Sequence, residues 1–196
     1  MIVRELLLGP KRFTDLRTGL PHASPNVLSQ RLRALEAANV VRRRTLPPPA
    51  ASRIYELTEW GLELEPVIDA LGRWGARAPL SPPEVGMSLD AHILSLRTLF
   101  DPALAEDFSA RIELRLGDDR FRADIADGRL ELVRGEATAP DAIIESDHGT
   151  LLALAHRRLE LGKALRAGDI AIEGDTEAVE RFVGLFTMPE PFAPAI

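Results

Sequence analysis

Four polar side chains in the first quarter of the chain recur at helical spacing and are of the kinds that bond to DNA base edges. They are Asn26, Ser29, Gln30 and Arg33. Asn and Gln pair with adenine, Arg pairs with guanine, and Ser serves either donors or acceptors in the major groove. At 100° per residue the four share one helix face, opposite an apolar stripe of Leu28, Leu32 and Leu35. The pattern indicates either an ordinary solvated face or a helix that contacts bases.

The segments around this helix favour the second interpretation. Ser24 is a good N-cap and Pro25 suits the first helical position, so the helix should begin there. A helix ending near Pro10, a short helix over residues 13–20 and a tight turn at residues 21–23 precede it. A recognition helix follows such a turn and uses its N-terminal residues. The order predicts a helix-turn-helix.

A cation-rich hairpin follows. Two short strands, residues 40–45 and 53–58, are joined by a proline-rich loop, which predicts a wing. Arginines at its base would neutralise phosphates and add affinity without sequence information, although a charge run is often only a solvated surface. With Ser24 and Arg31 on the helix, the predicted DNA contacts also include Arg42, Arg43, Arg44 and Arg53.

Residues 2–75 resemble the HxlR-type winged-helix transcriptional regulators, a branch close to the MarR regulators. The matching strings are IVRELLLG at residues 2–9, RFTDL at 12–16, SPNVLSQRLRALE at 24–36, YELT at 55–58, Gly61 and Trp74. The resemblance implies dimeric binding to double-stranded promoter DNA. Members of the family usually carry a further segment before the first helix, whereas this chain begins inside it, which indicates a late start or a lost arm.

One helix is predicted from Thr58, its cap, to Trp74, with a bend at Pro66. Its apolar side chains alternate at spacings of four and three: Trp60, Leu64, Val67, Leu71 and Trp74. This apolar stripe packs either on its own domain or on a second chain. A small winged helix cannot easily cover two tryptophans alone, which favours a homodimer.

Charge separates the two halves of the chain. Up to Pro79 there are 12 Lys and Arg against 8 Asp and Glu, a balance of +4, whereas the remaining residues carry 12 against 22, a balance of −10. The proline-rich segment between them is typical of a linker. We therefore expect a DNA-binding domain at residues 1–78, a linker at 79–87 and a second domain at 88–196.

The chain of 196 residues contains no cysteine, which excludes disulfides and thiolate catalysis. No signal peptide or long apolar run is present, so we expect a cytoplasmic protein without membrane insertion. His22, His92, His148 and His156 lack zinc-ligand spacing, and no nucleophile elbow, Walker loop or dinucleotide motif occurs. The expectation is a protein without catalytic residues, metal or cofactor.

The second half has an α+β pattern. A helix over residues 93–100 precedes alternating apolar residues at 108–116, 121–125 and 130–132, with turns at Gly117 and Gly128, which predicts an antiparallel meander. A strand at 142–144, a helix at 151–155, a strand at 170–172 and a helix opening at Asp175 or Thr176 complete the pattern.

This half resembles the sterol carrier protein fold, a sheet covered by helices around a lipid tunnel. The strings that carry the resemblance are DGRL at residues 127–130, PDAII at 140–144, SD at 146–147 and ALRAGDIAIEGD at 164–175. The resemblance implies binding of fatty acyl or other apolar molecules. The candidate lining residues are Leu114, Leu116, Phe121, Ile125, Leu132, Ile144, Leu152, Leu165, Ile172, Phe182 and Phe186. They could equally fill an ordinary core.

Together these features predict an α+β protein of two domains, an N-terminal winged helix-turn-helix and a C-terminal sterol-carrier-like sheet covered by helices. The expected function is that of a one-component transcriptional regulator, a repressor, that senses an apolar or lipid-like ligand. Two alternatives stay open for the second domain: a module for dimerisation or protein interaction only, or the remnant of a lipid-processing enzyme.

Overall fold

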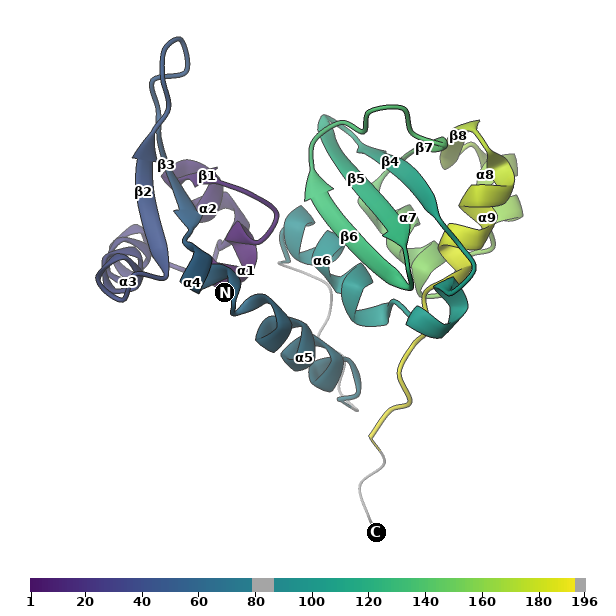
Figure 1. Ribbon diagram of the computed structural model, residues 1–196, viewed down its shortest axis with the longest axis horizontal. Helices are drawn as coiled ribbons and strands as arrows, with labels where there is room; N and C mark the ends of the chain where they lie inside the picture. The colour runs from purple at the N-terminus through teal and green to yellow at the C-terminus, as the bar shows by residue number, and fades with distance from the viewer. Residues whose placement is uncertain (79–86, 193–196) are drawn as a thin grey trace. The chain divides into compact units, whose positions relative to one another are not determined.

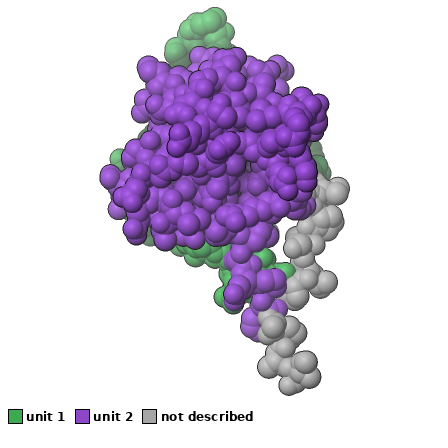
Figure 2. Space-filling view, turned by 90° about the vertical axis from the view of Figure 1, so that its right-hand side faces the viewer, with its two compact units in different colours: residues 1–91 green, residues 92–196 purple. Residues whose placement is uncertain are grey.

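The computed structural model describes residues 1–78 and 87–192 and divides the chain into two compact units. Unit 1 is Met1–Ala91 and unit 2 is His92–Ile196, coloured green and purple in Figure 2. Both contain helices and a sheet, which confirms the predicted α+β class. The predicted linker, residues 79–87, lies outside the described residues except for Met87.

Unit 1 is a winged helix-turn-helix, as predicted. Its helices α1 (Ile2–Leu6), α2 (Phe13–Gly19) and α3 (Pro25–Ala37) pack beside a three-stranded sheet in the order β1 (Lys11–Arg12), β3 (Arg53–Leu57) and β2 (Val41–Thr45). The core consists of buried aliphatic side chains: Leu6, Leu16, Leu20, Leu28, Leu32, Val40, Val41 and Leu57. The short strand β1 was not predicted, because two residues are too few to show a periodicity.

The local signals at both ends of α3 explain its length. The Ser24 hydroxyl accepts a hydrogen bond from the Val27 backbone N–H at 3.3 Å, and Pro25 occupies the first turn. At the other end Asn39 takes a left-handed φ of 55°, which asparagine tolerates better than most residues. The chain then reverses into β2 (Figure 1).

The base of the wing depends on one glycine. Thr58 donates its hydroxyl to the Asn39 carbonyl at 2.6 Å and accepts a hydrogen bond from the Gly61 N–H at 3.0 Å. A Cβ on Gly61 would lie 2.1 Å from the Val40 carbonyl oxygen. No other residue fits there without moving the backbone, which accounts for the glycine at this position.

The prediction of one continuous helix from Thr58 to Trp74 is wrong. The structure has two helices, α4 (Glu59–Leu62) and α5 (Glu65–Ala76). Pro66 has no N–H to donate to the Leu62 carbonyl, so the first helix ends and the second restarts with the proline in its first turn. None of the 12 residues of α5 is buried.

Unit 2 contains a five-stranded sheet in the order β6-β5-β4-β7-β8 (Figure 1). Strands β4 (Ala110–Leu116), β5 (Asp119–Ala126) and β6 (Arg129–Arg134) form the predicted antiparallel meander. The strand β7 (Ala142–Ser146) pairs in parallel with β4, and β8 (Ile170–Gly174) pairs antiparallel with β7. The parallel pairing was not predicted, because its partner residues lie 30 positions apart in sequence, as Ile112 and Ala142 show.

The helices of unit 2 are α6 (Leu89–Leu99), which begins at the end of unit 1, α7 (His148–Ala155), α8 (Leu161–Ala167) and α9 (Thr176–Gly184), with a 3-10 turn at Pro102–Ala105. Asp175 caps α9 through a hydrogen bond from Ala178 N–H at 3.1 Å. The helix α9 packs against β7, β8 and α7. A sheet covered by helices is therefore present, as expected.

The two faces of this sheet differ in chemistry. Leu114 lies opposite Phe121 on one side and opposite Ile144 on the other, all three fully buried. The opposite face carries charges, such as the Asp124 carboxylate, which lies 2.7 Å from both the Arg111 and the Arg122 guanidinium groups. Strand alternation produces this division, with every second side chain directed into the core.

Candidate functional site

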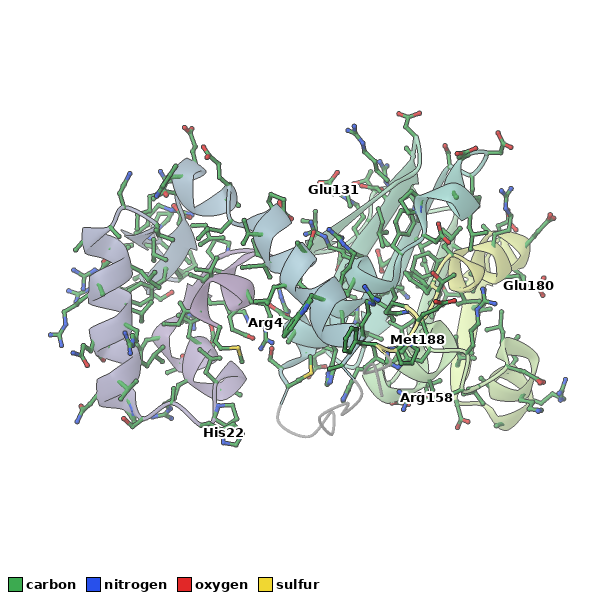
Figure 3. The ribbon with its side chains drawn as sticks, turned by 90° about the horizontal axis from the view of Figure 1, so that it is seen from below. Arg4, His22, Glu131, Arg158, Glu180 and Met188 are labelled. Carbon is green, nitrogen blue, oxygen red and sulfur yellow. The ribbon has the colours of Figure 1, made fainter. Side chains whose placement is uncertain are left out.

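The outward side of α3 is polar and accessible. Asn26, Gln30 and Arg33 are exposed and Ser29 is half-buried, while Leu28 and Leu32 on the inner side are buried. Side chains ending in nitrogen project outward from this helix at the left of Figure 3. The recognition face, defined as Asn26, Ser29, Gln30 and Arg33, thus presents donors and acceptors at the start of the second helix of the helix-turn-helix.

The other two DNA contacts predicted at α3, Ser24 and Arg31, lie outside the recognition face. The Ser24 hydroxyl is already engaged as the helix cap, so it is held at the helix start. Arg31 lies on the flank of α3 and lines a hollow of about 630 Å³. The remaining walls of the hollow are mostly apolar: Met1, Ile2, Val3, Gly19, Leu20, Pro21, His22, Ala23, Val27, Leu28, Ala34 and Leu35. His22, labelled in Figure 3, marks the turn between α2 and α3.

The wing arginines Arg42, Arg43, Arg44 and Arg53 are all exposed, but strand alternation sends them to different sides. Arg42 lies opposite Glu56 in the register of β2 and β3, and its Nε donates to Glu56 Oε1 at 2.7 Å. Arg44 donates from Nη2 to Glu56 Oε2 at 3.2 Å. Arg43 points to the other side of the strand, where its Nε lies 3.7 Å from Glu36 Oε1 of α3.

Glu56 and Glu36 were not singled out from the sequence as partners of the wing. The hydrogen bond from Arg44, with that from Arg42, lowers the pKa of Glu56 from its ordinary value despite the opposing effect of burial. Glu56 therefore stays ionised at neutral pH. Its position opposite Arg42 could have been inferred only with the register of the hairpin in hand.

The apolar candidates in unit 2 are brought together by the fold, with two exceptions. Leu114, Leu116, Phe121, Ile125, Leu132, Ile144, Leu152, Phe182 and Phe186 are all buried. They form one layer between the sheet and its helices, in which Phe182 and Phe186 pack edge to face at 5.2 Å. Leu165 is 38% exposed and Ile172 is half-buried, so these two lie at the margin of the layer.

Residues 1–78 and 87–192 contain neither a candidate metal site nor a candidate membrane-spanning helix. No group of three or more His, Cys, Asp or Glu side chains within this range could hold a metal ion. Within the same range, no helix has the length and apolar character needed to cross a membrane.

Comparison with known proteins separates the two units. Residues 1–80 match the HxlR-like helix-turn-helix family. The HTH-type transcriptional regulator YvaP of Bacillus subtilis is 38% identical over 74 residues, which are 38% of this chain and 68% of that protein. The regulator YodB of the same organism is 36% identical over 74 residues, 38% of this chain and 66% of that protein.

Residues 86–193 match the alkyl sulfatase C-terminal family. Among solved structures, the stereoselective inverting sec-alkylsulfatase Pisa1 from Pseudomonas sp. superposes with a TM-score of 0.50 at 21% identity. The match covers 56% of this chain and 17% of that enzyme. At this identity the likeness shows a shared fold only.

In unit 1 the helix-turn-helix and the wing agree with the HxlR-like family match. In unit 2 the sheet covered by helices agrees with the alkyl sulfatase C-terminal match. The chain belongs to the HxlR-like helix-turn-helix transcriptional regulators through its first 80 residues and to the alkyl sulfatase C-terminal family through residues 86–193.

Proposed function

We propose that this regulator is a cytoplasmic repressor that binds promoter DNA as a homodimer and releases it when unit 2 takes up an apolar ligand. The observation that carries the DNA-binding part is the exposed recognition face of α3, backed by a buried leucine stripe. In this proposal Asn26, Gln30 and Arg33 contact base edges. Ser24, Ser29, Arg31 and the arginine-bearing wing contact the backbone or neighbouring edges.

The apolar stripe on α4 and α5 supports the dimer. Trp60, Val67, Leu71 and Trp74 are between 58% and 73% exposed, although α5 has an apolar side typical of a packed helix. A second copy related by a two-fold axis would cover this stripe. It would also supply the second recognition helix that a pair of half-sites requires.

The apolar layer of unit 2 supports the ligand. Its walls are aliphatic and aromatic, as in sites for apolar molecules, and the family match is to proteins named for alkyl sulfates. Fatty acids, acyl thioesters and sec-alkyl sulfates are therefore the probes of choice. The near-complete burial of Leu114, Phe121 and Ile144 equally favours a second candidate function, in which the layer is a filled core and unit 2 serves only for dimerisation or protein interaction.

Operator selection tests the DNA-binding part. A random duplex library bound to the intact protein should yield a site with two related halves about one helical turn apart. Gln30→Ala should then cost about 1–3 kcal/mol of binding free energy at that site and relax the preference at one base pair. Equal binding of the parent and the variant to every operator variant would contradict the assigned face.

Native mass spectrometry of freshly purified protein tests the sensor. A copurified molecule, or added palmitate or a sec-alkyl sulfate retained at one equivalent per chain, would support a binding site in unit 2. A chain that retains none of these probes, while it still binds its operator, would favour the interaction module.

A further inference from the structure

Glu56 faces two wing arginines at once. Its Oε1 accepts a hydrogen bond from Arg42 Nε at 2.7 Å, and its Oε2 accepts one from Arg44 Nη2 at 3.2 Å. The Glu56 side chain is 11% exposed, whereas those of Arg42 and Arg44 are 66% and 48% exposed. A carboxylate held inside the hairpin therefore anchors two guanidinium groups that reach into solvent.

The third arginine of the run is held differently. Arg43 points to the opposite side of β2, and its 3.7 Å separation from Glu36 is longer than a hydrogen bond. Glu36 belongs to α3, so Arg43 lies on the side of the hairpin nearer to the recognition helix. The three consecutive arginines are thus divided into an anchored pair and one loosely held cation.

This division matters for DNA because phosphate contacts depend on the charge and the available N–H groups of each arginine. Arg42 and Arg44 give part of their donors to Glu56, whose negative charge also offsets part of theirs. Arg44 lowers the pKa of Glu56, so this neutralisation persists at neutral pH. Arg43 keeps more of its donors for a phosphate.

We propose that Glu56 is a positioning residue that sets the specificity of DNA binding. Its hydrogen bonds and negative charge reduce the contacts that Arg42 and Arg44 make with phosphates of any sequence. Arg43 is left as the wing cation that contacts the DNA backbone beside α3. The proposal rests on the wing contacting DNA, as proposed above. Removal of the Glu56 charge frees two arginines for phosphates of any sequence, which strengthens non-specific binding more than operator binding.

The test is Glu56→Gln, which keeps the shape of the side chain and removes its charge. Each freed arginine that gains a phosphate should steepen the salt dependence by about 0.9 and raise non-specific affinity roughly fivefold at 0.15 M salt. The operator affinity should rise less, so the ratio of specific to non-specific affinity falls. Glu59→Gln is the matched control, because it removes an exposed carboxylate from the same unit.

If melting curves show that Glu56→Gln is partly unfolded, a double-mutant cycle separates the effect of the Glu56 charge on DNA binding from its effect on folding. Arg42→Gln should reduce the salt slope by less than Arg43→Gln does in the parent, since Glu56 already engages Arg42. In the Glu56→Gln background the effect of Arg42→Gln should grow to about one unit. A merely structural role for Glu56 would lower the melting temperature and leave these slopes unchanged.

The outcomes separate this proposal from the proposed function. If Arg43→Gln weakens binding but Glu56→Gln behaves like Glu59→Gln, or if Arg42→Gln and Arg43→Gln cost the parent equally, the role of Glu56 is overturned and the wing contact stands. If none of the arginine variants changes DNA binding, the wing does not contact DNA. The wing contact and the role of Glu56 are then both overturned, whereas base contacts by α3 are tested separately by Gln30→Ala.

Discussion

Arg31 and Arg33 are two residues apart on α3 and have the same chemistry, yet their surroundings differ. Arg33 belongs to the exposed recognition face, whereas Arg31 lines the hollow beside α1 and the helix-turn-helix turn. The 100° step of a helix separates them by about 200° around its axis. A side chain on that side of the helix faces away from the base edges, so the contact expected of Arg31 is with the DNA backbone.

Replacement of the two arginines should therefore change DNA binding in different ways. Arg33→Ala should cost about 1–3 kcal/mol at the operator and relax the preference at one base pair. Arg31→Ala should weaken all sequences alike and flatten the salt slope by about one unit. Binding to a panel of single-base operator variants at several salt concentrations distinguishes them. A changed base preference for Arg31→Ala would place that side chain in the groove after all.

The Asp147 side chain is expected to stabilise unit 2 as the N-cap of α7. Its carboxylate caps α7 by accepting hydrogen bonds from the Thr150 hydroxyl at 2.6 Å and from the Gly149 N–H at 2.7 Å. The Thr150 hydroxyl, with the backbone N–H groups, lowers the pKa of Asp147 from its ordinary value against the effect of burial. Stability from this group is thus present above the unfolded pKa of about 3.9 and is lost as pH falls through the lower folded value.

Asp147→Ala should lower the free energy of unfolding by about 1 kcal/mol at pH 7, the usual cost of a lost N-cap. The difference from the parent should shrink below about pH 4, where the carboxylate becomes protonated. Asp147→Ser is the matched control, since it restores a cap without a titrating group. Urea unfolding at pH 7 and at pH 3 measures both effects, and an equal loss at the two values would exclude the charge as the cause.

At the scale of elements, α5 stands out because it is amphipathic and none of its residues is buried. Helices of this length owe most of their stability to packing of the apolar side. The break at Pro66 lets α5 start again in a direction of its own, and Figure 1 shows it running away from α1, α2 and the wing. The apolar side of α5 is thus exposed, as the proposed dimer requires.

Light scattering of the parent should give twice the chain mass of 21.5 kDa. Leu71→Glu should shift the protein towards the monomer and weaken binding to a two-halved operator, because it places a carboxylate in the middle of the apolar stripe. Arg73→Glu, on another side of the same helix, should leave the mass unchanged. A parent that is monomeric and still binds a palindromic site tightly would rule out this interface.

At the scale of the whole molecule, two units of different families and opposite charge balance share one chain. If unit 2 binds an apolar molecule and unit 1 binds DNA, the two binding free energies are linked. A ligand that lowers DNA affinity by some factor must itself bind the DNA complex less tightly by the same factor. Two separate titrations can check this reciprocity.

The prediction is that medium- or long-chain fatty acids or acyl thioesters release the parent from its operator. Ile144→Trp is the control, because extra volume at a fully buried position of the apolar layer should fill any site there. Fluorescence anisotropy of labelled operator measures release, and melting curves confirm that the variant is folded. Ligand binding without any change in operator affinity would leave unit 2 as a carrier or a docking platform.

The sequence by itself determined the features that depend on local chemistry. Ser24 and Pro25 marked the start of α3, the spacing of its leucines marked the buried side, and alternation in the second half marked the meander. These signals are local because caps, turns and periodic burial involve residues a few positions apart. The same locality explains why the recognition face could be chosen before its surroundings were known.

Only the tertiary structure decided which side chains meet across the fold. Glu56 and Arg42 are 14 residues apart and come together through the register of the hairpin, while Glu36 reaches Arg43 through the packing of α3 on β2. The pairing of β4 with β7 and the exposure of Leu165 likewise depend on long-range packing. Such contacts depend on the free energy of burying the whole core, which involves residues far apart in the chain and cannot be inferred from a short stretch of sequence.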